Sequence, residues 1–158
     1  MNEYKNGAYG ALIPTEESQR FIDSVSKTIE SVCEVEMNLG TIHHSTFLYT
    51  RSPCVFQPEH LDITYPLSAE IVDLTIHDDT KLIFTLESDD LWELHQTIYD
   101  KLQAKHAFED FLPHITLSYN FTKPIPRRIR NVFDGAEILF DDFWITDLTV
   151  DSNIASDV

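Results

Sequence analysis

The chain has 158 residues and carries 11 Lys or Arg residues against 27 Asp or Glu residues, which gives a formal net charge of −16. This acidity argues against a protein that grips long DNA or RNA or lies on an anionic membrane, because both modes of binding depend on Lys and Arg. A content of 42% hydrophobic and 11% aromatic residues excludes disorder and predicts a single globular domain over residues 1–158.

The predicted elements begin with a strand over residues 7–13. Thr15 is a suitable N-cap for a helix over residues 16–33, in which apolar residues recur at helical spacing. A strand is expected over residues 45–50. It leads into a Pro-bearing connection over residues 51–66, which fits either a lid over a site or an ordinary long loop.

The second half of the chain repeats the order of a helix followed by a strand. Ser88 can cap the second helix, which comes after a hairpin with a polar turn. The other expected elements are hairpin strands over residues 69–76 and 81–86, a strand over residues 114–119, a basic segment over residues 123–130, and final strands over residues 136–140 and 144–150. This repetition predicts an α+β domain with two pseudo-equivalent lobes.

The cysteines and the termini bear on the cellular setting. Cys33 and Cys54 form neither a disulfide framework nor a Cys-x-x-Cys pair, so reduced thiols and a cytoplasmic location are expected. The first nine residues are polar and lack the apolar region of a signal peptide. No apolar run approaches the length that crosses a membrane.

Two similar hexapeptides are the most informative feature of the sequence. They are His44-Ser-Thr46-Phe-Leu-Tyr49 and His114-Ile-Thr116-Leu-Ser-Tyr119. Each opens a predicted strand, and the two strands hold corresponding positions in the two halves. The shorter pattern His-x-Ser/Thr occurs four times in the chain, beginning at His43, His44, His95 and His114. The match at His95 lies in a predicted helix and the one at His43 overlaps the first hexapeptide, so neither shares this context.

Strand geometry gives the hexapeptides a chemical meaning. Side chains alternate across a strand, so His44 and Thr46 project from one face, as do His114 and Thr116, while Tyr49 projects from the other. If the pseudo-symmetry brings both strands together, two imidazoles and two hydroxyls line one cleft. The threonines can then bind a phosphate, and the two imidazoles can act as general base and general acid. We predict these four residues as the catalytic set.

Metal binding is a competing interpretation of the histidines. Hydroxyls are poor ligands beside imidazole, and the pattern His-Glu-x-x-His is absent from the sequence. Acidic residues are common enough to supply carboxylate ligands, so this alternative stays open. We predict neither a metal nor a cofactor.

Further ligand contacts are predicted from charge and from aromatic residues. Four of the 11 basic residues fall within residues 123–130, and Arg127 and Arg128 could form a positive lip that attracts a small anionic ligand. The alternative is a solvated loop with ordinary surface charge. Tyr9 and Trp144 are candidates for stacking on nucleobases, against the alternative that both pack in the core.

At the two motifs the sequence resembles the two-histidine phosphoesterase superfamily, and the stretch Pro113–Leu117 is similar to that family's second motif in full. The resemblance implies a bilobal fold with two pseudo-symmetric antiparallel-sheet lobes, helices packed outside and a central cleft. It also implies metal-independent action on cyclic phosphates or RNA-like phosphodiesters, with His44, Thr46, His114 and Thr116 as the catalytic residues. One departure is that His43 directly precedes the first motif and creates a neighbouring His-x-Ser register.

Within the superfamily the chain is most similar to bacteriophage anti-CBASS nucleases, in its size, its acidity, its Asn-Gly-Ala-Tyr-Gly opening and the spacing of its motifs. That similarity implies hydrolysis of 3′,5′-linked cyclic di- and trinucleotide messengers such as cGAMP in the host cytoplasm. A ribose 2′-hydroxyl would attack the adjacent phosphorus with the two histidines as base and acid, in an order that the sequence leaves open. The alternatives are a phosphodiesterase for RNA 2′,3′-cyclic phosphates or 2′-5′ linkages, and a non-catalytic cyclic-nucleotide sponge.

Overall fold

The computed structural model describes residues 2–38, 42–102 and 111–148. Its strands are β1 (Asn2–Tyr4), β2 (Ala8–Pro14), β3 (Ser45–Thr50), β4 (Cys54–Phe56), β5 (Leu67–His77), β6 (Lys81–Glu87), β7 (His114–Ser118) and β8 (Glu137–Asp147). Its helices are α1 (Glu16–Cys33), the 3₁₀ turn η1 (Pro58–His60), α2 (Asp89–Leu102) and the short α3 (Arg127–Arg130). The α+β class predicted from the sequence is confirmed.

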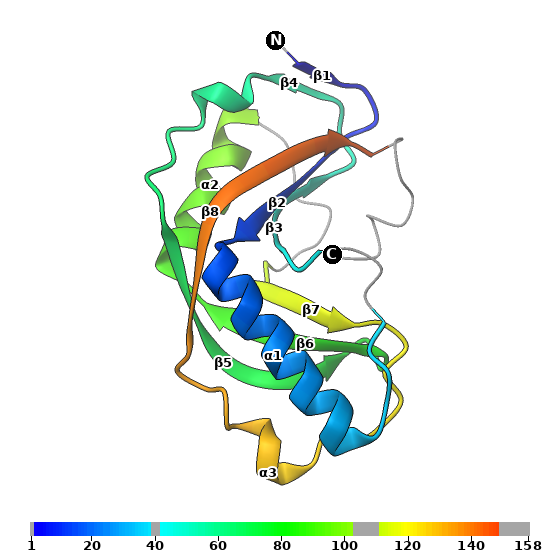
Figure 1. Cartoon of the computed structure of the whole chain (residues 1–158). Coiled ribbons are helices and arrows are strands. Elements are labelled where there is room, and N and C mark those ends of the chain that lie inside the picture. The colour runs from blue at the N-terminus through cyan, green and yellow to red at the C-terminus, as the bar shows by residue number, and fades with distance from the viewer. Residues whose placement is uncertain (1, 39–41, 103–110, 149–158) are drawn as a thin grey trace.

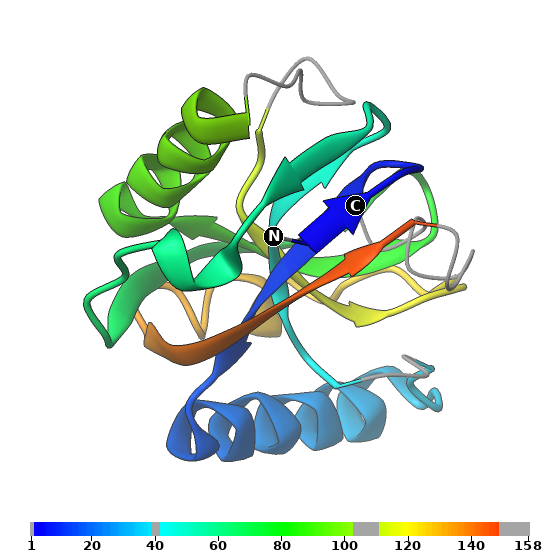
Figure 2. The same cartoon turned by 90° about the horizontal axis from the view of Figure 1, so that it is seen from above.

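Six antiparallel strands form the main sheet in the order β3-β2-β8-β5-β6-β7, and β1 pairs with β4 in a small separate sheet. The order is symmetric about its centre, because β3 corresponds to β7, β2 to β6 and β8 to β5. The long strand β8 joins the halves, pairing with β2 along its C-terminal part and with β5 along its N-terminal part. The outermost strands β3 and β7 also contact each other, so the sheet curls and brings its two ends together (Figures 1 and 2).

Both long helices begin at the residues that the sequence predicts. The Thr15 hydroxyl accepts a hydrogen bond from the Ser18 amide, and the Ser88 hydroxyl accepts one from the Leu91 amide. These bonds satisfy amides that a helix leaves unpaired at its N-terminus. In α1, acidic residues occupy the first turn, where the helix dipole stabilises negative charge.

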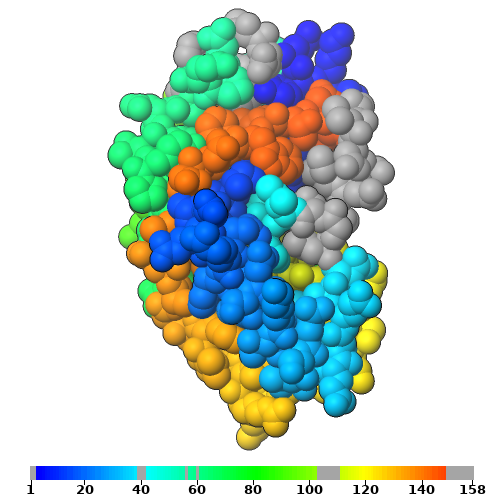
Figure 3. All heavy atoms as spheres, viewed as in Figure 1, coloured from blue at the N-terminus to red at the C-terminus, as the bar shows by residue number. Residues whose placement is uncertain are grey.

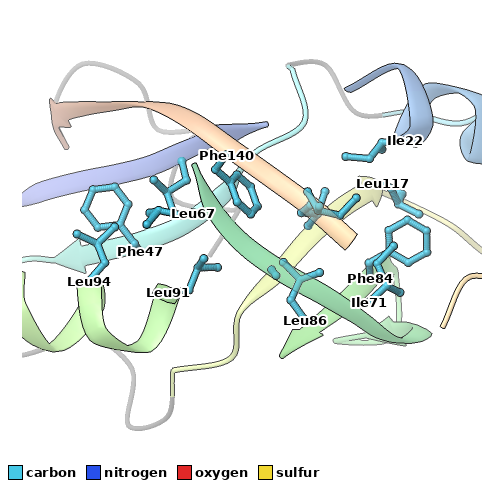
Figure 4. Close-up of a cluster of buried hydrophobic side chains, with 14 of the residues drawn as sticks. Ile22, Phe47, Leu67, Ile71, Phe84, Leu86, Leu91, Leu94, Leu117 and Phe140 are labelled. Atoms are coloured by element: carbon cyan, nitrogen blue, oxygen red, sulfur yellow. The ribbon is translucent and has the colours of Figure 1, made fainter. Parts of the chain in front are cut away.

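The two long helices join both halves of the sheet in one core: α1 contacts β2 and β8, and α2 contacts β5 and β3. Ile22 of α1 lies with Leu117 and Phe84 of the second half, whereas Leu94 of α2 lies with Phe47 of the first (Figure 4). All five side chains belong to one hydrophobic core on a single face of the sheet. The opposite face of the sheet is therefore left for other residues.

Helix α2 also supplies hydrogen-bond partners to backbone groups of the outer strand β3. The Tyr99 hydroxyl on α2 accepts a hydrogen bond from the Tyr49 amide at 2.8 Å and donates one to the Tyr49 carbonyl at 2.7 Å. The His95 Nδ1 atom lies 3.1 Å from the Phe47 carbonyl oxygen. Unpaired edge groups invite pairing with other chains, and α2 removes that hazard here. Burial raises the pKa of the Tyr99 hydroxyl, which keeps the donor protonated.

We expect Tyr99→Phe to lower the free energy of unfolding by about 1–3 kcal/mol, because two buried backbone groups of Tyr49 lose their partner. Urea denaturation followed by circular dichroism measures the change. The matched control is Tyr65→Phe, which removes a hydroxyl from an exposed ring. Equal unfolding free energies for the two variants would contradict this account of the β3 edge.

The structure departs from the sequence prediction at the last strand. The strands expected over residues 136–140 and 144–150 are one strand, β8, as far as Asp147, and residues 149 and 150 lie outside the described part. The acidic pair between the two predicted strands does not interrupt pairing, because Asp141 is an extra residue in a β-bulge opposite Ile13 and Pro14.

The Pro-bearing connection is also more structured than expected. Its strand β4 pairs with β1, and Leu61 is buried in the hydrophobic core. Both cysteines, Cys33 and Cys54, are buried and free, in keeping with the expected reduced thiols.

Candidate active site

The two motif histidines are held in the same way in both halves of the sheet. His44 directly precedes β3 and His114 is the first residue of β7. The Nδ1 atom of His44 lies 2.8 Å from the Ile42 carbonyl oxygen, and that of His114 lies 2.7 Å from the Leu112 carbonyl oxygen. A carbonyl oxygen only accepts hydrogen bonds, so both Nδ1 atoms carry the proton. In the neutral ring Nε2 is then an acceptor, as a general base requires.

The Tyr9 hydroxyl connects the two residues of the first motif. It lies 2.9 Å from His44 Nε2 and 2.8 Å from Thr46 Oγ1. When the His44 ring is neutral, Nε2 accepts a hydrogen bond from the Tyr9 hydroxyl, and the Tyr9 oxygen is left to accept one from Thr46. This contact confirms that His44 and Thr46 share one side of the strand, as their spacing predicts.

Each motif threonine is followed by a β-bulge, which the sequence prediction missed. In the first half Ala11 pairs with Thr46 and Gly10 with Leu48, so Phe47 is the extra residue. In the second half Leu117 is the extra residue, because Ile83 pairs with Thr116 and Leu82 with Ser118. Bulges concentrate beside active sites, where they redirect side chains.

The first bulge corrects the expectation for Tyr49. Strict alternation would put Tyr49 on the face opposite Thr46, but the extra residue shifts the alternation by one. Tyr49 therefore pairs with Tyr9, and their ring centroids are 6.3 Å apart in an edge-to-face arrangement. Both tyrosines belong to a small cluster of buried residues separate from the main core.

The motif residues occupy the sheet face opposite the hydrophobic core. Along β6, Leu82 and Phe84 are fully buried in that core. The residues that alternate with them therefore point to the other side. We call this side the motif face. By strand register its members are Tyr9, Ala11, Thr46, Tyr49 and Trp144 in the first half and Lys81, Ile83, Thr85, His114 and Thr116 in the second.

The two predicted stacking residues both lie beside the first histidine. The Trp144 ring is centred 6.0 Å from His44 and 5.1 Å from Tyr9, and it is half-buried. Tyr9 is 0% exposed, so its ring offers no open face to a nucleobase in this structure. Its contribution to the site is instead the hydroxyl that joins His44 to Thr46.

The histidine of the overlapping His-x-Ser pattern, His43, contacts α1 and not Tyr9. His43 turns towards α1, where its Nδ1 atom lies within hydrogen-bonding distance of Gln19 Nε2 and 3.5 Å from Asp23 Oδ1. Burial lowers the pKa of His43, the Asp23 carboxylate partly offsets this, and His44 lowers it further. His43 therefore braces the start of the motif against α1, and His44 is the histidine of the pair that faces Tyr9.

The predicted positive lip, Arg127 and Arg128, lies away from the two motifs. Arg127 and Arg128 are exposed on α3, at the lower end of the molecule (Figure 3). Burial raises the pKa of Cys33 at the end of α1, and the charges of Arg128 and Lys123 oppose that rise. Arg130 of the same helix lies 3.6 Å from Asp73 of β5.

The ring of His77 near the second motif, and Lys81 opposite it in the β5–β6 hairpin, were not singled out from the sequence. The His77 ring is centred 6.4 Å from the His114 ring, and His77 pairs with Lys81 across the β5–β6 hairpin. The pairing of His77 with Lys81 in that hairpin could have been combined with the position of the second motif. Together they would have placed both residues on the motif face.

Other potential sites lie away from the motifs. A cavity of about 220 Å³ is lined by residues 61–64, Leu67 and α2, and a second of about 470 Å³ is lined by carboxylates of β5, β6, α2 and β8. No group of three or more metal-ligating side chains is found among the described residues. In that same part of the chain, no helix has the length and apolar content needed to cross a membrane.

A symmetric antiparallel sheet with a His-x-Thr motif on each outer strand, and a helix packed over each half, defines the two-histidine phosphoesterase fold. The crystal structure of TT0787 from Thermus thermophilus shares this fold, with a TM-score of 0.60 and 15% identity over 88% of this chain and 86% of that one. The anti-CBASS protein Acb1 of Enterobacteria phage T4 is 28% identical over 121 residues, which cover 76% of this chain and 78% of that protein. The family model for anti-CBASS protein Acb1 matches residues 6–153. The chain belongs to this family.

Proposed function

We propose that the protein is a phosphodiesterase that hydrolyses 3′,5′-linked cyclic di- and trinucleotides and thereby counteracts CBASS antiphage signalling. The family supplies the biological role, because its name ties it to opposition to CBASS. The chemistry is supported by one observation above all: both motif histidines are locked in the same tautomer beside a buried threonine. The curled sheet brings the strands that carry them into contact.

The reaction follows from these four side chains. One imidazole accepts the proton of a ribose 2′-hydroxyl through Nε2 as the 2′-oxygen bonds to the adjacent phosphorus. The bond from phosphorus to the 5′-oxygen breaks, and the other imidazole, in its protonated form, gives that oxygen a proton. On ligand binding the Thr46 hydroxyl turns from Tyr9 to the phosphate, so that Thr46 and Thr116 each donate a hydrogen bond to a non-bridging oxygen. The first product ends in a 2′,3′-cyclic phosphate, which water then opens to a 3′-phosphate.

The surroundings of the motifs fit a small ligand with both bases and phosphates. Trp144 is the half-buried aromatic ring beside His44, and stacking on such a ring contributes about 1–3 kcal/mol per base. Side chains supply both the proton transfers and the phosphate contacts, so the mechanism requires no metal ion. The acidic charge of −16 opposes a long polyanion much more than a ring with two or three phosphates.

The decisive experiment incubates the protein with a panel of 3′,5′-linked cyclic di- and trinucleotides, with and without a chelator, and analyses the heat-denatured mixture by chromatography. We expect linear products in both conditions. Intact ligand released on denaturation would instead identify a sponge. Cleavage confined to RNA 2′,3′-cyclic phosphates or 2′-5′ linkages would identify the other enzymatic alternative.

A further inference from the structure

The two halves of the sheet can be compared position by position through their register. In each half the pair that contains the motif threonine adjoins the bulge, so it provides a common reference. These pairs are Ala11 with Thr46 and Ile83 with Thr116. Tyr9 lies two residues before the reference pair on β2, and Lys81 lies two residues before it on β6. Lys81 is therefore the counterpart of Tyr9.

The position of Tyr9 defines what a side chain at this place can reach. Its hydroxyl contacts both the histidine and the threonine of its own half. A lysine side chain has a reach similar to that of tyrosine. Lys81 lies on the motif face because its neighbour Leu82 is fully buried in the hydrophobic core. Lys81 therefore starts from the place on the motif face that corresponds to Tyr9.

His77 provides an independent measure of that reach. It lies directly opposite Lys81 in the β5–β6 hairpin, so both residues start from the same row of the sheet. The centroid of its ring is 6.4 Å from that of His114. A side chain from this row thus extends to the second motif histidine.

We propose that the Lys81 ammonium group binds a non-bridging oxygen of the scissile phosphate together with Thr116, an inference that rests on the proposed function. The first half then contributes a neutral hydroxyl at this position and the second half a positive charge. Lysine binds phosphate as a compact point charge. The negative charge on the phosphoryl oxygens grows as the 2′-oxygen attacks, so the ammonium group stabilises the transition state more than the substrate. In a chain of net charge −16, such a cation on the motif face also offsets repulsion of the ligand.

The test compares Lys81→Gln and Lys81→Arg with Lys27→Gln, which removes an exposed charge on α1. Steady-state kinetics use cyclic GMP–AMP with two 3′–5′ linkages, and calorimetry measures binding of its 2′-deoxy analogue. We expect Lys81→Gln to lower kcat/KM about 100-fold or more, as loss of an oxyanion donor does, mostly through kcat. Lys81→Arg should recover at least part of this loss. Lys27→Gln should match the wild type.

The outcomes separate this inference from the proposed function. If the wild type cleaves the substrate and Lys81→Gln is equally active, the proposed role of Lys81 is wrong. The proposed function is then unaffected. Equal losses in Lys81→Gln and Lys81→Arg, accompanied by a lower urea midpoint, would assign Lys81 a purely structural role and also overturn the inference. Wild-type protein that neither cleaves cyclic GMP–AMP nor binds the 2′-deoxy analogue would contradict both.

Discussion

His44→Ala and His114→Ala should each lower kcat for a cyclic dinucleotide by about 10²–10⁴-fold, because each removes one of the two proton-transfer groups. The ligand contacts of the threonines remain, so binding of the substrate should be partly retained. Residual activity should also lose one limb of the bell-shaped pH profile that a general acid and a general base produce together. Rapid-quench kinetics and calorimetry measure the two effects separately.

His43→Ala is the matched control for the first of these variants. It removes a neighbouring imidazole that contacts Gln19 and Asp23 rather than Tyr9. We expect its kcat to stay within about 10-fold of the wild type, since it affects only the bracing of the strand. If His43→Ala were as inactive as His44→Ala, the catalytic motif of the first half would be the pattern that begins at His43 and not the one that begins at His44.

Replacement of the ribose 2′-hydroxyls by hydrogen should abolish cleavage of a cyclic dinucleotide that still binds. The proposed nucleophile belongs to the substrate itself, and its proximity to phosphorus corresponds to an effective concentration of about 10⁵ M or more. Water has no comparable advantage, so a rate loss of about 10⁵-fold is expected. Chromatography of long incubations sets the limit on the residual rate.

Calorimetry of the 2′-deoxy ligand with wild-type protein provides the control for binding. A dissociation constant close to that of the ribose ligand on His114→Ala protein would show that the lost cleavage is chemical in origin. Turnover of the 2′-deoxy ligand at the rate of the ribose ligand would rule out attack by the 2′-hydroxyl, whatever the behaviour of the histidine variants.

The elements predicted best from the sequence are those fixed by local signals. The helix over residues 16–33 and the strand over residues 45–50 have the bounds that were predicted. Their signals are an N-cap, a helical apolar stripe and a run of residues with high β propensity, and each depends only on residues that are neighbours in the sequence. The motif residues His44 and His114 were singled out as catalytic candidates in the same way, since two similar hexapeptides in equivalent halves are visible without a structure.

The features that were missed depend on partners far away in the sequence. The extra residues Phe47 and Leu117 form bulges only relative to their partner strands β2 and β6. The alternation of side chains along a single strand does not reveal them. The same holds for the hydroxyl of Tyr9, which meets His44 only after β2 and β3 have paired. Arg127 and Arg128 were assigned by proximity in sequence, whereas the contact of α3 with β5 depends on tertiary structure.

The unlike residues at the two equivalent positions, Tyr9 and Lys81, have a consequence for a ligand that is itself two-fold symmetric. Such a ring has two interchangeable linkages, but in the proposed mode of binding the first half of the sheet presents a hydroxyl to it and the second half a charge. Only one linkage at a time can face the acid and the base in their working order. The proposed reaction therefore opens the ring once in each encounter, and a second cleavage requires the linear product to turn round or to leave and return.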